Sequence, residues 1–203
     1  MAGGAGLVST ADPVAGWRDA LRGDWSVLSR EPLNCEVPPV LLDRDVTPIS
    51  RFFRRNHLGI PELDAGAWRL EIGGMVRHPL SLSLNELKRY GSVSAGAVLE
   101  CAGNGRSLYV PAAEGEQWGL GAAGNAKWTG VRLADVLDAA GVQRGAVEVV
   151  FRGADRGTVN NSPETIPFER SLSLADARYS GALIVFAMND EPLPASIAIQ
   201  LGS

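Results

Sequence analysis

The stretch that most constrains this chain runs from Val98 to Ser107, where a short apolar run ends in a cysteine and a turn of small residues. The turn, Cys-Ala-Gly-Asn-Gly-Arg, leaves the backbone almost bare, so a large ligand can approach it closely. It ends at Arg106, whose planar guanidinium suits an oxyanion. A lone cysteine at the end of a strand is usually a small buried hydrophobic residue. The pattern alone therefore leaves two interpretations of Cys101 open: a core residue, or a ligand to a metal or cofactor.

Length and composition indicate one globular domain with a substantial core, because 203 residues with 45% hydrophobic and 21% charged content are typical of such domains. The net charge of −4 argues against a nucleic-acid-binding protein, which would carry a basic face. No apolar stretch reaches the length of a membrane span, and no targeting signal is visible. We therefore expect no membrane partner and, by default, a cytoplasmic protein. Cys35 and Cys101 are too few for a disulfide framework, although a single bridge between them stays open.

A second informative stretch lies between Thr47 and Pro61, where two aromatic residues precede two arginines, an asparagine and a histidine. Histidine can act as a proton switch or a ligand, and an Asn-His pair offers mixed hydrogen-bond donors and acceptors. The segment Phe52–His57 is therefore either a solvated basic loop that follows a core strand or a polar loop that binds a ligand.

Residues Gly119 to Gly124 match the Gly-x-Gly-x-x-Gly pattern of dinucleotide-binding folds, and Asp138 stands at about the spacing of their ribose-binding carboxylate. That fingerprint also needs an apolar strand before it and a helix after it. Residues 114–118 do not form an apolar run, and Gly130 would interrupt a following helix. We therefore expect a loop here, and a nucleotide-binding oxidoreductase is the weaker alternative.

Periodicity and capping residues predict strands and helices without strict alternation, which favours an α+β domain over a doubly wound sheet. The clearest helix covers residues 131–141, with one apolar face and Gly141 at its end. A second helix is expected over 84–90, with Ser83 as its N-cap. The remaining expected elements are strands at 68–74, 97–100, 147–151 and 182–187 (the last two buried), a helix near 12–21, an extended arm over 31–39, and a turn or short helix at 172–177.

Two of these stretches resemble motifs of the sulfite oxidase family, whose members carry a molybdenum–molybdopterin cofactor. The stretches are Cys-Ala-Gly-Asn-Gly-Arg at 101–106 and Phe-Phe-Arg-Arg-Asn-His at 52–57, and the resemblance extends from about Glu31 to Pro194. In that family the cysteine supplies the protein sulfur ligand to molybdenum, and soft thiolate ligation suits a redox metal. The resemblance therefore implies that Cys101 is a metal ligand.

The same resemblance implies roles for the surrounding side chains. Arg55 and Arg106 would act with Cys101 as catalytic residues and neutralise an anionic substrate. Gly105 stands where many family members have arginine, which removes one charge from the anion pocket. Asp155 has a second interpretation, because an aspartate after a strand often bonds its own backbone in a turn. The implied cofactor-binding set is Phe53, Arg54, Arg55, Asn56, His57, Cys101 and Asp155.

The resemblance also implies a compact, strand-rich α+β fold of the sulfite oxidase molybdopterin-binding type. We expect a leader with a candidate short helix over residues 1–30, the cofactor domain over 31–194, and a divergent tail over 195–203. After Pro194 the chain does not continue with the cofactor-binding residues and closing strands of the family pattern. We therefore expect a domain that is incomplete at its C-terminus.

The implied reaction is the transfer of an oxo group to sulfite at the cysteine-ligated molybdenum, which gives sulfate. Electrons would then leave to an external acceptor, either another protein or oxygen, because the chain has two histidines and no Cys-x-x-Cys-His haem motif. Three alternatives stay open: a related molybdoenzyme that acts on nitrate or a sulfoxide, an impaired remnant or fragment without bound cofactor, and the nucleotide-binding enzyme. No oligomeric state is predicted.

Overall fold

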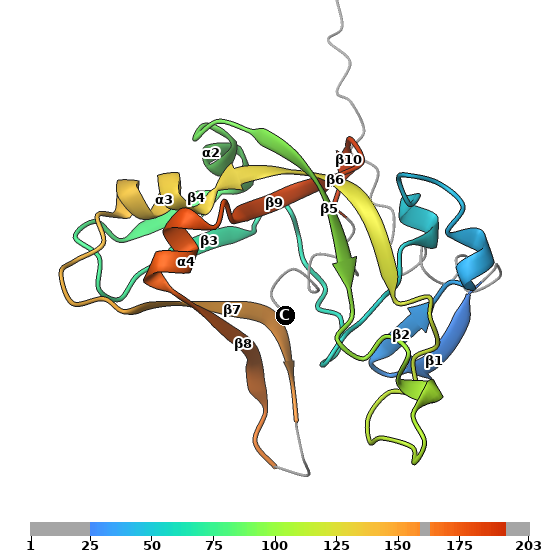
Figure 1. Cartoon of the computed structure of the whole chain (residues 1–203). Coiled ribbons are helices and arrows are strands. Elements are labelled where there is room, and N and C mark those ends of the chain that lie inside the picture. Colours follow the sequence, from blue (N-terminus) through green and yellow to red (C-terminus); the bar gives the residue numbers. More distant parts are fainter. Residues whose placement is uncertain (1–24, 159–162, 194–203) are drawn as a thin grey trace, which may run out of the picture.

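The computed structural model describes residues 25–158 and 163–193, which form a strand-rich α+β fold (Figure 1). Its strands pair antiparallel in four sheets. The largest has the order β10-β9-β6-β5, with bounds β5 (Val93–Glu100), β6 (Ala123–Arg132), β9 (Leu183–Met188) and β10 (Glu191–Pro192). The two-stranded sheets are β1 (Ser26–Arg30) with β2 (Leu33–Glu36), β3 (Arg69–Ile72) with β4 (Leu80–Ser83), and β7 (Glu148–Gly157) with β8 (Ile166–Ser173). The predicted fold class is confirmed.

The helices within the described residues are short, and none is long and apolar enough to cross a bilayer. They are α2 (Leu84–Lys88), α3 (Leu133–Ala140) and α4 (Leu174–Tyr179), with 3-10 turns η1 (Pro39–Leu41), η2 (Ile49–Arg51) and η3 (Arg106–Leu108). The helix predicted over 131–141 forms as α3 but begins two residues later than expected, because Val131 and Arg132 end β6. Its apolar face is buried, and Gly141 ends it with a φ of 67°. That face packs on α4 through Leu133, Leu137 and Ala177.

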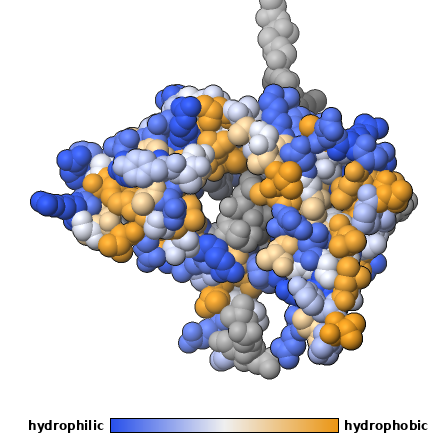
Figure 2. Space-filling model, in the orientation of Figure 1, coloured by the Kyte–Doolittle hydropathy of each residue, from blue (hydrophilic) through white to orange (hydrophobic). Residues whose placement is uncertain are grey.

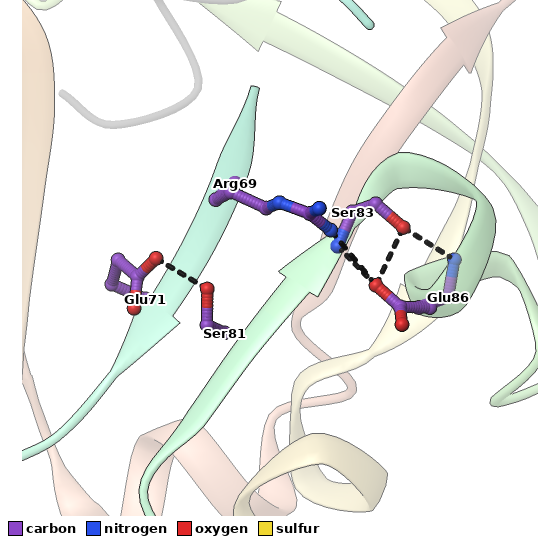
Figure 3. A network of polar contacts seen from close by, with 5 residues as sticks. All are labelled: Arg69, Glu71, Ser81, Ser83 and Glu86. Atoms are coloured by element: carbon purple, nitrogen blue, oxygen red, sulfur yellow. Dashed lines mark hydrogen bonds and ion pairs between the residues drawn. The ribbon is translucent and has the colours of Figure 1, made fainter. Parts of the chain in front are cut away.

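The helix predicted after Ser83 is confirmed as α2, and a capping box begins it (Figure 3). The Ser83 Oγ accepts the Glu86 N–H at 3.3 Å, and the Glu86 carboxylate accepts the Ser83 N–H at 2.8 Å. Arg69 of β3 donates to the same carboxylate at 3.0 Å. These bonds tie α2 to the edge of the β3–β4 sheet and hold the pKa of the Glu86 carboxyl below its usual range.

The strand predicted to present Cys101 is confirmed and is longer than expected. β5 pairs with β6 along its whole length, from Val93 to Glu100. On its other side β6 pairs with β9, and the two backbones come so close that a Cβ on Gly130 would clash with the Ile184 carbonyl. Because β5 ends at Glu100, the cysteine is the first residue beyond the sheet.

Two expectations about strand burial are wrong. The β-branched run at 147–151 predicts a buried strand, yet β7 is mostly exposed. Val150 within it is 54% accessible, and Val147, just before it, is 77% accessible. The reason is that β7 pairs with β8 in a two-stranded ribbon that projects from the rest of the fold, so much of it meets solvent (Figure 1). The strand expected at 182–187 is confirmed as β9, but it is half-buried.

The extended arm expected over 31–39 contains a fully buried strand, because all four residues of β2 lie in the interior. Its prolines stand on either side of β2: Pro32 in the turn after β1, and Pro38 and Pro39 after the strand ends. They therefore bound the strand without interrupting its ladder. The helix expected near 12–21 and the divergent tail over 195–203 lie outside the described residues.

The part of the core that adjoins Cys101 is an aromatic cluster. Phe52 and Phe53 stack with ring centroids 5.3 Å apart, and Trp128 meets Phe52 edge-on at 5.5 Å. Cys101 packs against the margin of this cluster. Figure 2, in the orientation of Figure 1, shows an open gap between the part of the molecule that carries α3 and α4 and the part that carries β1 and β2.

Candidate functional site

β2 lies at the centre of the candidate site, because it holds two segments that are distant in sequence. Its backbone joins the arginine-rich segment: the Cys35 N–H donates to the Arg54 carbonyl at 3.0 Å, and the Arg54 N–H donates back at 2.9 Å. This bridge lays residues 54–56 alongside β2. The second segment is the loop at residues 116–121, which the side chains of Asn34 and Glu36 contact. Their spacing of two residues places these two side chains on the same side of the strand.

The Glu36 carboxylate accepts two backbone N–H groups of the glycine-rich loop, from Gly119 at 2.7 Å and Gly121 at 3.0 Å. A Cβ on Gly121 would clash with the Val37 backbone carbonyl oxygen, so only glycine fits there. After this loop Gly124 lies in β6, where a dinucleotide fold would begin a helix. The loop prediction is confirmed for residues 119–122, whereas residues 123–132 form β6. The dinucleotide-binding alternative is wrong, because a carboxylate already occupies the N–H groups and a strand replaces the helix.

Asn34 is completely buried and joins the arginine-rich segment to the loop that follows β5. Its Oδ1 accepts the Asn56 N–H at 2.7 Å and Arg55 Nη1 at 3.5 Å, and its Nδ2 donates to Glu116 Oε1 at 3.4 Å. The backbone carbonyl of Glu116 in turn accepts Arg106 Nη1 at 3.5 Å. The two arginines predicted to bind an anion are thus linked through two intervening residues.

Cys101 begins that loop, and its thiol is neither sealed in the core nor fully exposed. The Gly103 N–H donates to its Sγ at 3.4 Å, and its own N–H donates to the Ala122 carbonyl at 2.9 Å. Cys35 differs, because burial raises the pKa of its thiol to about 12 and so keeps it protonated. Both cysteines are free, so the disulfide left open by the sequence does not form.

Arg55 and His57 form a hydrogen-bonded pair beyond the bridge to β2. Arg55 Nη2 donates to His57 Nδ1 at 3.0 Å, and because a guanidinium can only donate, the imidazole carries its proton on Nε2. His57 also stacks on Phe168 of β8 with centroids 4.9 Å apart, and the Arg170 guanidinium lies 4.3 Å from the same ring. Desolvation, with the charges of Arg55 and Arg170, lowers the pKa of His57 to about 4. The imidazole is therefore neutral at pH 7 and offers an Nε2–H donor.

β7 touches the same segment and carries Asp155. A Cβ on Gly157 would lie 2.9 Å from Leu58, so this end of β7 rests on the residue that follows His57. Asp155 lies two residues earlier, on the buried side of the strand, and burial raises the pKa of its carboxyl. Its position inside β7, beside a shift in the pairing with β8, corrects the expectation of a turn residue at a strand end.

Two buried side-chain oxygen atoms among the described residues have no hydrogen-bond partner: Oδ1 of Asn56 and Oδ2 of Asp155. Both residues belong to the set predicted to bind a cofactor. Buried acceptors are normally satisfied, and an unpaired one costs about 1–3 kcal/mol. Each of these atoms therefore has acceptor capacity that the described residues do not use.

Phe53 and Arg54 occupy different positions from the rest of the predicted set. Phe53 is a core residue whose ring meets Trp118 edge-on. The Arg54 guanidinium is buried and donates to the backbone carbonyls of Ile49, Phe52 and Phe53. These two side chains support the segment from the core side, whereas Arg55, Asn56 and His57 make the contacts described above.

Asn34, Glu36 and Phe168 are not among the site residues that the sequence predicts. A signal for the first two exists, because they alternate with the apolar residues Leu33, Cys35 and Val37 in the pattern of a strand. The neighbouring prolines predict irregular structure, so the strand pattern between them was not recognised. Phe168 gave no comparable signal, since its contact with His57 depends on how the β7–β8 ribbon folds back.

The described residues contain no group of three or more His, Cys, Asp or Glu side chains that could hold a metal ion. Cys101 is therefore not part of such a cluster among the described residues.

Comparison with known proteins identifies similar domains. A family model for the oxidoreductase molybdopterin-binding domain matches residues 57–197. The mitochondrial sulfite oxidase of Macaca fascicularis is 39% identical over 199 residues, which cover 94% of this chain and 35% of that protein. The NADH nitrate reductase of Ulva prolifera is 36% identical over 131 residues, covering 61% of this chain and 15% of that protein. The chain spans about a third of the length of the sulfite oxidases it matches.

The fold also matches a solved structure. The crystal structure of the sulfane dehydrogenase SoxCD from Paracoccus pantotrophus aligns with a TM-score of 0.69 and 24% sequence identity. The alignment covers 97% of this chain and 49% of that one. At this identity the match supports the fold.

Replacing Glu36 by glutamine is expected to lower the free energy of unfolding by about 1–3 kcal/mol, because the amide NH2 group would face one loop N–H and leave it unsatisfied. Urea unfolding followed by tryptophan fluorescence measures the change. Glu71→Gln is the matched control, since its carboxylate accepts an exposed Ser81 hydroxyl that an amide oxygen can also accept. We expect less than about 0.5 kcal/mol there. Equal losses in the two variants would contradict the role of Glu36.

His57 is expected to make folding stability pH-dependent. Its pKa is about 4 in the folded chain and about 6.5 when unfolded, so the unfolded state binds the proton first as the pH falls. Its stabilising contribution is therefore complete above pH 6.5 and is lost as the pH falls toward 4. We expect His57→Gln to show a shallower loss of the free energy of unfolding between pH 7 and pH 5, measured by urea titration.

His78→Gln serves as the control for this experiment, because it changes the other described histidine without touching Arg55 or Phe168. In this variant the free energy of unfolding should depend on pH as it does in the wild type. A His57→Gln variant with an unchanged slope would show that the imidazole is not held neutral by its surroundings.

Proposed function

Because this chain belongs to the family of oxidoreductase molybdopterin-binding domains, we propose that it binds the molybdenum–molybdopterin cofactor and oxidises sulfite to sulfate. Similarity to sulfite oxidases over most of the chain supports sulfite as the substrate. The observation that carries the proposal is the pair of unpartnered buried acceptors, Asn56 Oδ1 and Asp155 Oδ2, in a fold that also presents a partly exposed thiol at Cys101.

The residues present fit such a cofactor. A pterin carries amino and ring N–H donors, which complement the two unpartnered acceptor oxygen atoms. Cys101 would supply a thiolate to the metal, and the small residues of its turn leave room for a bulky group. His57 offers an Nε2–H to an anionic oxygen of the cofactor. The cofactor itself would provide the remaining metal ligands, which agrees with the absence of a cluster of protein ligands in the described residues.

When bound, the cofactor supplies oxo transfer and takes up the electrons of the oxidation. The chain's own residues bind and orient the substrate. Arg55 and Arg106 carry charges that neutralise the sulfite anion, and their planar forks suit its oxygen atoms. In the balanced reaction sulfite gains one oxygen atom that derives from water, two protons are released, and two electrons pass to an external acceptor, either a protein or oxygen.

A second candidate function is nitrate reduction, which the similarity to the nitrate reductase of Ulva prolifera favours. Nitrate, like sulfite, is a small anion with three oxygen atoms, so the same arginines would bind it, while the electrons would flow in the opposite direction. Sulfite-dependent reduction of a dye and nitrate-dependent oxidation of a reduced dye separate the two activities directly.

Replacing Cys101 by serine is expected to abolish sulfite-dependent turnover in the full chain, because serine removes the soft ligand. The loss should exceed the roughly 10- to 100-fold effect typical of residues that only support a metal ligand. Dye-reduction kinetics and the molybdenum content of the purified protein are the two measurements.

Cys35→Ala is the matched control, since it removes the buried thiol and leaves the backbone bridge to Arg54 in place. It should retain turnover and molybdenum. Undiminished turnover in Cys101→Ser would contradict the proposed role of this cysteine. Wild-type protein that takes up no molybdenum when produced with a cofactor supply would instead favour the cofactor-free remnant.

A further inference from the structure

We propose that Asn34 is the positioning residue of the anion site: it fixes the Arg55 guanidinium and, through Glu116, joins it to the loop that carries Arg106. This inference rests on the proposed function, because it assigns the two arginines to the substrate anion. Neither the sequence motifs nor the family match includes Asn34, which precedes the matched residues 57–197.

The Asn34 side chain uses all of its polar atoms in a completely buried position. Its oxygen accepts the Asn56 N–H at 2.7 Å and Arg55 Nη1 at 3.5 Å, and its nitrogen donates to Glu116 Oε1 and to the Pro32 carbonyl, each at 3.4 Å. A buried amide with its donors and acceptors engaged has one orientation available. Asn34 can therefore serve as a fixed reference for both segments.

The Arg55 guanidinium needs a fixed contact of this kind. A long side chain has many rotamers, whereas binding a substrate requires a single one. Its guanidinium is held by the Asn56 carbonyl at 2.5 Å, by His57 Nδ1 at 3.0 Å and by Asn34 Oδ1. The first two acceptors belong to residues next to Arg55 in sequence and move with it. Asn34 is the acceptor that ties the guanidinium to a different element of the fold.

The acceptors around both arginines are neutral. Arg55 meets an amide oxygen, a carbonyl and a neutral imidazole, and Arg106 meets the Glu116 backbone carbonyl. Among the described residues no carboxylate forms an ion pair with either guanidinium. No direct ion pair therefore cancels either positive charge, and both can attract an anion.

Asparagine at this position orients the Arg55 guanidinium and does not cancel its charge. Alanine would leave the Asn56 N–H without its acceptor and free the Arg55 fork. Aspartate would keep an acceptor at the same place but would pair its charge with Arg55. Asn34→Asp therefore keeps an acceptor for Arg55 but pairs a negative charge with it. Its second oxygen replaces the Nδ2 donor opposite Glu116 Oε1 and the Pro32 carbonyl, so the link to Glu116 is lost as well.

The test measures inorganic sulfate binding by isothermal titration at constant ionic strength, on the full chain carrying its cofactor, beside steady-state kinetics with sulfite. We expect Asn34→Asp to raise the Kd for sulfate at least about tenfold, with a parallel rise in KM for sulfite and a smaller change in kcat. Asn85→Asp is the matched control: it adds the same charge on the exposed face of α2 and should bind sulfate as the wild type does.

A second pair of variants gives the same test if Asn34→Asp fails to fold. Glu116→Gln keeps an acceptor for the Asn34 amide and should preserve sulfate affinity or increase it. Glu116→Ala removes the acceptor and should weaken sulfate binding, although loss of a carboxylate by itself would strengthen it. Tighter binding in Glu116→Ala, or an unchanged Kd in folded Asn34→Asp, would overturn the inference.

Arg55→Met separates failure of this inference from failure of the proposed function. If Arg55→Met weakens sulfate binding and Asn34→Asp does not, only the role of Asn34 is overturned. If Arg55→Met also leaves the Kd unchanged, the assignment of Arg55 to the anion fails, and the inference fails with it.

Discussion

The Glu36 carboxylate takes two backbone N–H groups from a loop more than eighty residues away, and the rest of the site depends on that contact. A nearly buried charge is costly unless hydrogen bonds satisfy it, so the strand that carries Glu36 and the loop that supplies the N–H groups must come together. The same strand presents Asn34, which reaches the arginine-rich segment. One buried strand therefore fixes the distance between the two motifs of the site.

Electrostatics explains why so many of these contacts are made by neutral groups. Arg55 and Arg106 are oriented by amide, carbonyl and imidazole acceptors, which position a guanidinium without cancelling its charge. The neutral His57 fits this scheme, because a second cation beside Arg55 would be unfavourable. Cys35 and Arg54, in contrast, are buried behind the site, where burial raises the pKa of the thiol and lowers that of the guanidinium.

Local patterns in the sequence predicted the elements whose structure is local. The periodicity of 133–140 and the glycine after it gave α3, and the short apolar run before Cys101 gave the end of β5. Burial of β7 could not be predicted, because β-branched residues favour a strand whether or not a second sheet covers it. The motifs identified Arg55, Asn56 and Cys101 as site candidates. Asn34 and Glu36 were not predicted, because their roles depend on hydrogen-bond partners that only folding brings close.

The central claim of this account is that the Cys101 sulfur ligates the metal of the cofactor at the junction that β2 holds together. X-ray absorption at the molybdenum K-edge, on purified wild-type protein and the Cys101→Ser variant, tests it most directly because it counts the sulfur atoms around the metal. The account predicts that the variant loses one sulfur scatterer from the metal's coordination shell. An identical sulfur shell in the two proteins would contradict it.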